Sequence, residues 1–329
     1  MRIGLTYDLR SEYLNEGYSL EETAEFDRES TIEGLENALM SLGFETERIG
    51  HVRQLASRLV TGDRWDLVFN ISEGIHGIGR EAQVPCLLDA YRIPYTFSDP
   101  LVLTLTLHKG MTKRVIRDAG LNTPGFFVVY SEADICIDAL EFPLFIKPVA
   151  EGTGKGISGK SKVGSALELL ETCRKLLVEY PAGLLVEEFL PGREFTVGIT
   201  GTGKNSKAVG IMEIEYKQDS ASGIYSLETK ANYEELVSYS VPEDRVREAC
   251  TDLAVKAWNI LGCRDGGRVD IRYDRYGKPS FIEVNPLAGL DLVHSDLPIL
   301  AYRNGFTYEQ LIGEIMDSAL ARIKPTTGS

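Results

Sequence analysis

The chain has 329 residues, of which 43% are hydrophobic and 26% are charged, and its formal net charge is −14 at pH 7. This composition is typical of a globular protein, and the length allows two or three lobes. The negative charge argues against nucleic acid as a partner, because phosphate neutralisation needs clustered Lys and Arg. No apolar run approaches the roughly 20 residues of a membrane helix, so no membrane partner is expected.

The cysteines and the N-terminus indicate the compartment. The five cysteines are scattered, with no C-x-x-C pair and no His at metal-ligand spacing. This pattern is typical of buried, reduced thiols. The first residues, Met1 to Asp8, read as a strand and lack the apolar stretch of a signal peptide. We therefore expect a cytoplasmic protein.

Short apolar strands and amphipathic helices alternate over the first hundred residues. Strands are expected at residues 2–7, 44–49 and 66–71, and helices at residues 31–42 and 83–91. This βαβ order predicts an N-terminal α/β domain over residues 1–100, built on a parallel sheet. Ligands bind at the carboxyl ends of the strands in such sheets.

Two further lobes follow a helix expected at residues 107–119. The central lobe, residues 101–186, has strands at residues 125–130, 144–148 and 184–188 and a helix at residues 166–180. The C-terminal lobe, residues 187–329, has strands at residues 193–200, 209–216, 267–273 and 280–285 and helices at residues 246–261 and 308–323. The absence of a Pro/Ser-rich linker indicates that the lobes are tightly fused.

The most informative local pattern is a hairpin in the C-terminal lobe. Residues 267–273 and 280–285 flank a polar turn in which Gly277 is the expected positive-φ residue. Alternation along a strand places Arg268 with Asp270 on one face, and Glu283 with Asn285 on the same face of the hairpin. Val269, Ile271, Ile282 and Val284 should then point to the core. Carboxylate and amide oxygens of this kind suit Mg²⁺, although a solvated hairpin face with incidental charges would give the same pattern.

A glycine-rich loop follows the strand that ends at Lys147. Glycines 152, 154 and 156 allow backbone amides to approach phosphate closely. The loop is not a Walker A motif, because Lys155 is followed by glycine and not by Ser or Thr. It is not a dinucleotide-binding fingerprint either, because no acidic residue for the ribose follows at the expected distance. A mobile loop without ligand and a phosphate clamp both remain open on these residues alone.

Charged side chains also follow two apolar strands. Lys147 ends the run Phe142-Pro-Leu-Phe-Ile, and a lysine in a cleft usually has an anionic partner. The strand at Leu184 runs into Glu187 and Glu188, and Glu194 comes after Gly192. This acidic connection between lobes is a candidate contact for adenine and ribose, although surface acids would look the same.

In this order and spacing, several segments resemble the ATP-grasp superfamily and specifically its D-alanine–D-alanine ligase branch. The segments are Ile93-Pro-Tyr-Thr-Phe-Ser-Asp-Pro, Lys109-Gly-Met-Thr-Lys, Ile146-Lys-Pro, Glu151-Gly-Thr-Gly-Lys-Gly-Ile, Glu187-Glu-Phe-Leu-Pro-Gly-Arg-Glu, Gly267-Arg-Val-Asp, Ile282-Glu-Val-Asn-Pro and His294-Ser-Asp-Leu-Pro. The resemblance implies an ATP-grasp fold with an N-terminal Rossmann-like lobe, and an enzyme that joins a carboxylate to an amine through an acylphosphate. The family also suggests a homodimer.

The resemblance implies a role for each matching residue. ATP would be bound by Lys109, Lys147, Glu151, Gly152, Gly154, Lys155, Gly156, Glu187, Glu188, Phe189, Leu190 and Glu194, with Lys109 and Lys147 on the phosphates, Glu187 and Leu190 on adenine and Glu194 on ribose. Two Mg²⁺ ions, which Mn²⁺ can replace, would be held by Asp270, Glu283 and Asn285. Arg268 would stabilise the oxyanion of the tetrahedral intermediate, and Lys230 and Thr153 complete the expected catalytic set.

The substrate side departs from the family pattern. The Gly-Gly-x-Ser-x-Glu-His signature of the ligases is absent, and an acidic stretch from Glu21 to Glu29 follows instead, so that Glu25 or Asp27 is the candidate for the substrate's amine. The glycine-rich loop has Thr153-Gly154 where the ligases have Ser-Ser. Ala231 follows Lys230 at a position where the family pattern has a tyrosine, and Asp296 occupies a position that is usually apolar in the ligases. The expected substrate residues are Glu25, Arg80, Glu81, His294, Ser295 and Asp296.

Three hypotheses for function follow. The first is a D-alanine–D-alanine ligase-like enzyme that forms a peptide bond between small amino-acid substrates. The second is an ATP-grasp ligase for other amino acids, or for an amino acid and a metabolite, in which Asp296, Arg80 and Glu81 pair with charged groups of the substrate. Surface ion pairs would give the same pattern. The third is a nucleotide-binding protein without catalysis.

Overall fold

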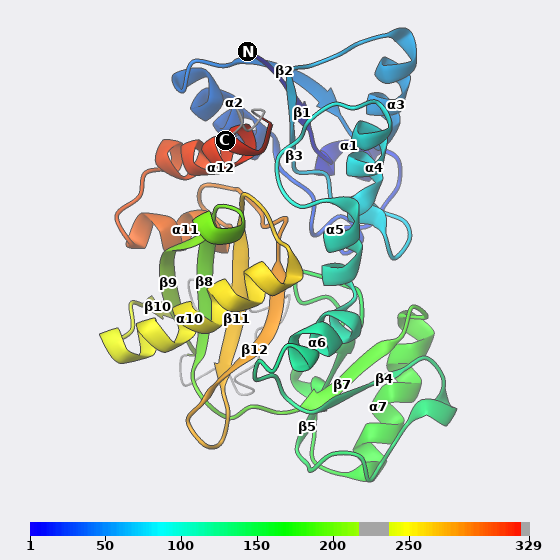
Figure 1. Cartoon of the computed structure of the whole chain (residues 1–329). Coiled ribbons are helices and arrows are strands. Elements are labelled where there is room, and N and C mark those ends of the chain that lie inside the picture. The colour runs from blue at the N-terminus through cyan, green and yellow to red at the C-terminus, as the bar shows by residue number, and fades with distance from the viewer. Residues whose placement is uncertain (217–236, 324–329) are drawn as a thin grey trace.

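The computed structural model describes residues 1–216 and 237–323. Figure 1 shows three sheets: one at the N-terminal end, a five-stranded sheet beside it, and a small third sheet to which helix α6 leads. Sequence reasoning predicted this α/β architecture. No helix within the described ranges is long and apolar enough to cross a bilayer.

The N-terminal sheet is parallel, with strand order β2-β1-β3. Its elements are β1 (Arg2–Thr6), α1 (Arg10–Asn15), α2 (Glu29–Ser41), β2 (Glu45–Gly50), α3 (Val52–Thr61), β3 (Leu67–Asn70) and α4 (Gln83–Ala90). The predicted strands and the helices α2 and α4 are confirmed. Sequence reasoning did not predict α3, whose Leu55 and Leu59 are buried one helical turn apart.

Two consecutive helices lead from the first lobe to the central one: α5 (Pro100–Leu107) and α6 (Lys109–Asp118). The single helix predicted over residues 107–119 begins at Lys109, because His108 breaks from α-helical geometry with ψ 88°. The apolar sequence of α5 alternates like a strand, but Asp99 caps its N-terminus and Pro100 occupies the first turn.

The central sheet has four strands in the order β4-β7-β5-β6. They are β4 (Phe126–Val129), β5 (Leu144–Pro148), β6 (Lys162–Val163) and β7 (Leu184–Glu188), covered by α7 (Ala166–Glu179). Strand β7 pairs antiparallel with both β4 and β5. In this register Lys147 lies opposite Leu185, and Glu187 lies opposite Phe145. Lys147 and Glu187 are therefore diagonal neighbours on one face of the sheet.

The C-terminal sheet is antiparallel, with strand order β10-β9-β8-β11-β12. Its strands are β8 (Glu194–Thr200), β9 (Lys207–Tyr216), β10 (Val237–Ser240), β11 (Gly266–Tyr273) and β12 (Pro279–Asn285). Helix α10 (Asp244–Leu261) covers the face that carries Val197 and Val269, whereas α11 (Asp296–Arg303) packs against Gly198 on the other face. Sequence reasoning did not predict α11.

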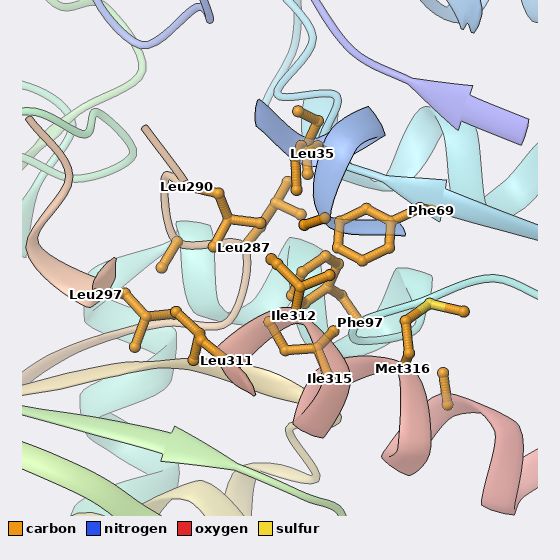
Figure 2. Packing of buried hydrophobic residues seen from close by; sticks show 14 of the residues in the cluster. Leu35, Phe69, Phe97, Leu287, Leu290, Leu297, Leu311, Ile312, Ile315 and Met316 are labelled. Atoms are coloured by element: carbon orange, nitrogen blue, oxygen red, sulfur yellow. The ribbon is translucent and has the colours of Figure 1, made fainter. Parts of the chain in front are cut away.

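The last helix, α12 (Tyr308–Ile323), joins the first and last lobes. In Figure 2 its side chains Ile312 and Ile315 lie near Phe97, and Leu35 from α2 and Phe69 from β3 complete the same cluster. All five are at most 1% exposed. A shared core of this kind fixes the two lobes relative to each other.

Candidate functional site

The β11–β12 hairpin presents its polar residues on one face, as predicted. Arg268 lies opposite Asn285, and Asp270 lies opposite Glu283. The pairing then shifts, so that Ile271 lies opposite Phe281 and Ile282 is the extra residue of a β-bulge. Ile282 therefore lines the cavity beside Glu283, and the prediction that it points to the core is wrong.

A cavity lies between this hairpin and the central sheet. Its walls include the predicted residues Lys109, Lys147, Glu151, Gly152, Thr153, Gly154, Glu187, Glu188, Phe189, Leu190, Glu194, Arg268, Asp270 and Glu283. Residues from four separate stretches of the chain, around Lys109 and at residues 147–154, 187–194 and 268–283, thus meet in one place. We call this space the nucleotide cavity. Lys155, Gly156 and Asn285 are not part of its walls.

One end of the nucleotide cavity is cationic. Lys147 Nζ lies 3.0 Å from Glu187 Oε1 and 3.6 Å from Glu283 Oε2. Lys109 Nζ donates to the carbonyl of Glu151 at 2.5 Å and lies 3.9 Å from Glu283 Oε2. Burial lowers the pKa of Lys147, but Glu187 and Glu283 outweigh burial and raise it to about 12. Lys147 is therefore an ammonium ion, and both lysine side chains can donate to phosphate oxygens.

The other end of the cavity offers an aromatic ring and carboxylates. Phe189 lies between two cations, with Lys162 Nζ 4.1 Å and the Arg272 guanidinium 5.1 Å from the ring centroid. Glu194 Oε2 accepts from the Tyr216 hydroxyl at 2.8 Å and from Arg272 at 3.1 Å. A flat ring and acceptor oxygens are suited to a nucleoside.

Glu187 lines the nucleotide cavity and is 3% exposed. Its Oε2 is fully buried and lacks a hydrogen bond from any described residue. Lys113 Nζ lies 2.8 Å from this oxygen as an ion pair, but the angles are not those of a hydrogen bond. Sequence reasoning gave Lys113 no role, because its helical position does not reveal the buried carboxylate behind it.

The hairpin carboxylates have the properties of a cation site. Burial raises the pKa of Asp270, and so does the neighbouring Glu283, while Arg268 lowers it. The side chain of Asp270 accepts from the Thr196 hydroxyl at 2.9 Å. The described residues contain no group of three or more His, Cys, Asp or Glu side chains that could hold a metal ion. Two facing carboxylates and an amide nevertheless fit Mg²⁺, which takes its other ligands from phosphates and water.

Arg268 lies at the junction of the hairpin with α11. Its Nη1 bonds to Asp270, and its Nε lies 3.9 Å from Asp296 Oδ2. Burial lowers the pKa of Arg268, but both carboxylates raise it above its usual range. Arg268 is a permanent, oriented cation.

A second cavity adjoins the first and shares Arg268 and Thr153 with it. Its walls also include Arg10, Glu21, Glu25, Asp27, Arg28, Glu73, Asn285, Asp291, His294, Ser295 and Asp296. We call it the substrate cavity. Of the predicted substrate residues, Glu25, His294, Ser295 and Asp296 line this cavity, whereas Arg80 and Glu81 do not. Asp27, the alternative to Glu25, lines it as well. Glu73 was missed, although its position just after β3 is the signal expected for a ligand residue in a parallel sheet.

Glu25 is hydrogen-bonded to the glycine loop in this structure. Its Oε1 accepts from the Gly152 amide at 2.8 Å, and its Oε2 accepts from Arg80 at 3.1 Å. Arg80 also donates to the carbonyl of Ala150 at 2.9 Å. Arg80 and Glu81 are 7% and 8% exposed, so the interpretation of these two as surface ion pairs is wrong. Lys155 also forms an ion pair with Glu25, with its Nζ 3.6 Å from Glu25 Oε2.

Comparisons with known proteins agree with this geometry. A family model described as "D-ala D-ala ligase C-terminus" matches residues 115–317. The D-alanine–D-alanine ligase of Bordetella petrii is 31% identical over 295 residues, covering 88% of this chain and 86% of the relative. The chain belongs to the D-alanine–D-alanine ligase family.

Two further similarities complete the comparison. The uncharacterized protein y4sG of Sinorhizobium fredii is 32% identical over 263 residues, covering 78% of this chain and 75% of that protein. A crystal structure of the Bacillus anthracis D-alanine–D-alanine ligase complexed with ATP has a TM-score of 0.73 at 22% identity and covers 100% of both chains. The structural similarity shows that the chain has the ATP-grasp fold of the family. Its membership of the ligase family makes it an ATP-dependent, peptide-bond-forming ligase.

Not every family residue can be located in the structure. Lys230, predicted as catalytic, lies outside the described residues. Thr153 has a φ of 53° and lines both cavities, between Gly152 and Gly154 of the loop. The side chain of Ser295, the N-cap residue of α11, accepts no hydrogen bond from the amides of that helix, and its Oγ accepts from the Asp291 amide at 3.0 Å.

Proposed function

We propose that this ligase transfers the γ-phosphoryl group of ATP to the carboxylate of one amino acid and joins the acyl group to the amine of a second. D-alanine is the first candidate for both substrates. The observation that carries the proposal is that the nucleotide and substrate cavities adjoin and share Arg268 and Thr153. Reacting groups held in such cavities would meet at Arg268.

The two steps balance chemically. The substrate carboxylate attacks the γ-phosphorus, so that an acylphosphate forms and ADP leaves. The amine then attacks the acyl carbon, inorganic phosphate leaves, and the amine's proton goes to a base or to solvent. Both steps develop negative charge on phosphoryl or acyl oxygens.

The chain's own residues have distinct parts in this mechanism. Lys109 and Lys147 bind the phosphates and hold them beside the hairpin. Arg268 is held by Asp270, and it stabilises the oxyanion of the tetrahedral intermediate from a fixed position. Asp270, Glu283 and Asn285 would hold Mg²⁺, which neutralises charge on the β- and γ-phosphates when bound.

A second candidate is a ligase for other amino acids, or for an amino acid and a metabolite. The acidic walls of the substrate cavity support this alternative. Burial and the nearby Asp8 raise the pKa of Asp27, and burial and Glu81 raise the pKa of Glu73. Asp296 lines the same cavity. A substrate with an extra cationic group would be favoured there over a second D-alanine.

Several finer points belong to this proposal. The reaction corresponds to EC 6.3.2.4 if both substrates are D-alanine, and to another member of EC 6.3.2 otherwise. Mg²⁺ is the expected metal, with Mn²⁺ as a substitute. Because ATP is the energy source, we expect the reaction in the cytoplasm, and we expect a homodimer.

Phosphate release tests the proposal directly. The purified protein is incubated with ATP, Mg²⁺ and either D-alanine alone or pairs drawn from a panel of neutral and basic amino acids, and the product mass is measured. Phosphate release with D-alanine and a product of the dipeptide's mass support the first candidate. Release only with another pair supports the second. Tight ATP binding without amino-acid-stimulated phosphate release would contradict both candidates and would indicate a nucleotide-binding protein without catalysis.

A further inference from the structure

We propose that Lys113, a residue outside both cavities, is a positioning residue that supplies the surplus positive charge for nucleotide phosphate binding. This inference rests on the proposed use of ATP. Lys113 is 0% exposed and therefore cannot touch a bound nucleotide in this structure. Its effect must pass through Glu187, the carboxylate that separates it from Lys147.

The three charged groups form a buried row from α6 through β7 to β5. Lys113 Nζ lies 2.8 Å from Glu187 Oε2, and Lys147 Nζ lies 3.0 Å from Glu187 Oε1. The side-chain exposures of Lys113, Glu187 and Lys147 are 0%, 5% and 5%. Each carboxylate oxygen thus faces one ammonium group, and Lys147 is shared between Glu187 and the more distant Glu283.

The charge balance explains why this arrangement matters. Lys109, Lys113 and Lys147 contribute three positive charges, and Glu187 and Glu283 contribute two negative ones, so that one positive charge is in excess. Without Lys113 the four remaining charges would sum to zero. Lys147 would then be the only ammonium group left to pair with Glu187. Charges in a buried site are weakly screened, so the triphosphate would lose a substantial attraction.

Lys113 also has structural contacts that must be separated from this role. Its Nζ donates to Thr123 Oγ1 at 3.1 Å and to the carbonyl of Phe281 at 3.4 Å, which ties α6 to β12. A packing defect would lower stability in proportion to these contacts. A loss of the positive charge of Lys113 would instead weaken ATP binding, and removal of a nearby negative charge would restore part of that binding.

The test measures ATP binding by isothermal titration calorimetry, together with thermal unfolding, for wild type and three variants. Lys113→Met removes the charge and keeps the length of the side chain. Lys113→Arg keeps the charge. The double variant Lys113→Met with Glu187→Gln removes one charge of each sign and restores the excess of one. Steady-state kinetics then give KM for ATP and for the amino acid separately.

We expect Lys113→Met to weaken ATP binding at least about tenfold, the change that corresponds to roughly 1.4 kcal/mol. KM for the amino acid should stay near that of the wild type. Lys113→Arg should bind ATP better than Lys113→Met, and the double variant should recover part of the lost affinity. Equal ATP affinity in wild type and Lys113→Met, or a Lys113→Arg variant that binds ATP no better than Lys113→Met, would overturn the inference. If the wild type itself binds no ATP, the proposed function fails instead.

Discussion

At the scale of single residues, the cavity walls hold ionisable groups whose charge depends on their neighbours. Asp270 and Glu283 face each other on adjacent strands, and the charge of Glu283 helps to raise the pKa of Asp270. Lys109 and Lys147 offset part of this repulsion from the side of Glu283. A divalent cation would offset the rest, which is the physical reason to expect metal dependence here.

Replacing Asp270 with Asn, or Glu283 with Gln, should therefore weaken Mg²⁺ binding. We expect activity to fall at least about tenfold at low millimolar Mg²⁺ and to recover partly as Mg²⁺ is raised, because one carboxylate ligand is lost. The measurement is phosphate release across a Mg²⁺ titration. Glu179→Gln, in an exposed pair with Lys175, is the matched control. Wild-type turnover of either hairpin variant at limiting Mg²⁺ would rule out the metal assignment.

Glu81 gives a prediction about pH. Burial raises the pKa of Glu81 to about 7, and Arg80 opposes this shift. A carboxyl whose folded pKa is raised prefers to be protonated in the folded state, so it destabilises the fold increasingly as pH rises from its unfolded pKa to about 7.

Glu81→Gln should remove this penalty. The variant should match the wild type below pH about 4.5 and should gain stability relative to it up to pH about 7, by at most about 3 kcal/mol. Urea denaturation at a series of pH values measures the difference. A gain that is independent of pH, or a loss that grows with pH, would contradict the burial argument.

At the scale of elements, the glycine loop is held by the acidic segment of the first lobe. The Gly152 amide donates to Glu25, and Arg80 bonds to the carbonyl of Ala150 two residues earlier. A Cβ atom at Gly152 would lie 2.5 Å from Glu25 Oε1. The loop conformation beside the nucleotide cavity therefore depends on a residue that is distant in sequence.

Gly152→Ala should displace Glu25 and the loop together. We expect a several-fold higher KM for ATP, because the new methyl group separates the amide from its acceptor. Gly164→Ala is the matched control, since its Cβ would meet nothing closer than Glu168 Oε2 at 3.7 Å. Steady-state kinetics with varied ATP distinguish the two. Equal KM values would mean that the loop does not need this contact.

At the scale of the whole molecule, Asp265 links the lobes. It is fully buried, and it accepts from the Phe97 amide at 2.8 Å in the first lobe and from the Ser318 hydroxyl at 2.8 Å on α12. Arg322 also bonds to both of its oxygens. These contacts hold α12 against the segment that leads into α5.

Asp265→Asn should destabilise the whole fold by about 2–4 kcal/mol, because it leaves Arg322 without its charge partner and removes acceptor capacity. Asn tolerates the φ of 63° at this position, so backbone strain does not confound the result. Denaturant unfolding measures the change. Asp252→Asn, in an exposed pair with Lys256, should change stability by less than about 1 kcal/mol. A similar small effect at Asp265 would argue against its role as a link.

Sequence patterns predicted most elements, and most of the ATP-site residues named from the family resemblance line the nucleotide cavity. Alternation in the hairpin correctly placed Arg268, Asp270, Glu283 and Asn285 on one face, because strand geometry is local. The same alternation failed at Ile282, because a bulge is set by the pairing partner. The alternating sequence of α5 likewise hid a helix whose start is marked only by the Asp99 cap and by Pro100 in the first turn.

The sequence by itself determined the family, the order of the lobes and the chemical types of the site residues, since these depend on local pattern and motif spacing. Only the tertiary structure decided which charges meet: Lys113 with Glu187, Glu25 with Arg80 and the glycine loop, and Asp296 with Arg268. These residues are far apart in the chain, and their pairing follows from how three sheets pack around two adjoining cavities. Burial then modulates the strength of each interaction, because the desolvation of a charged group depends on the surrounding structure as well as on residue type.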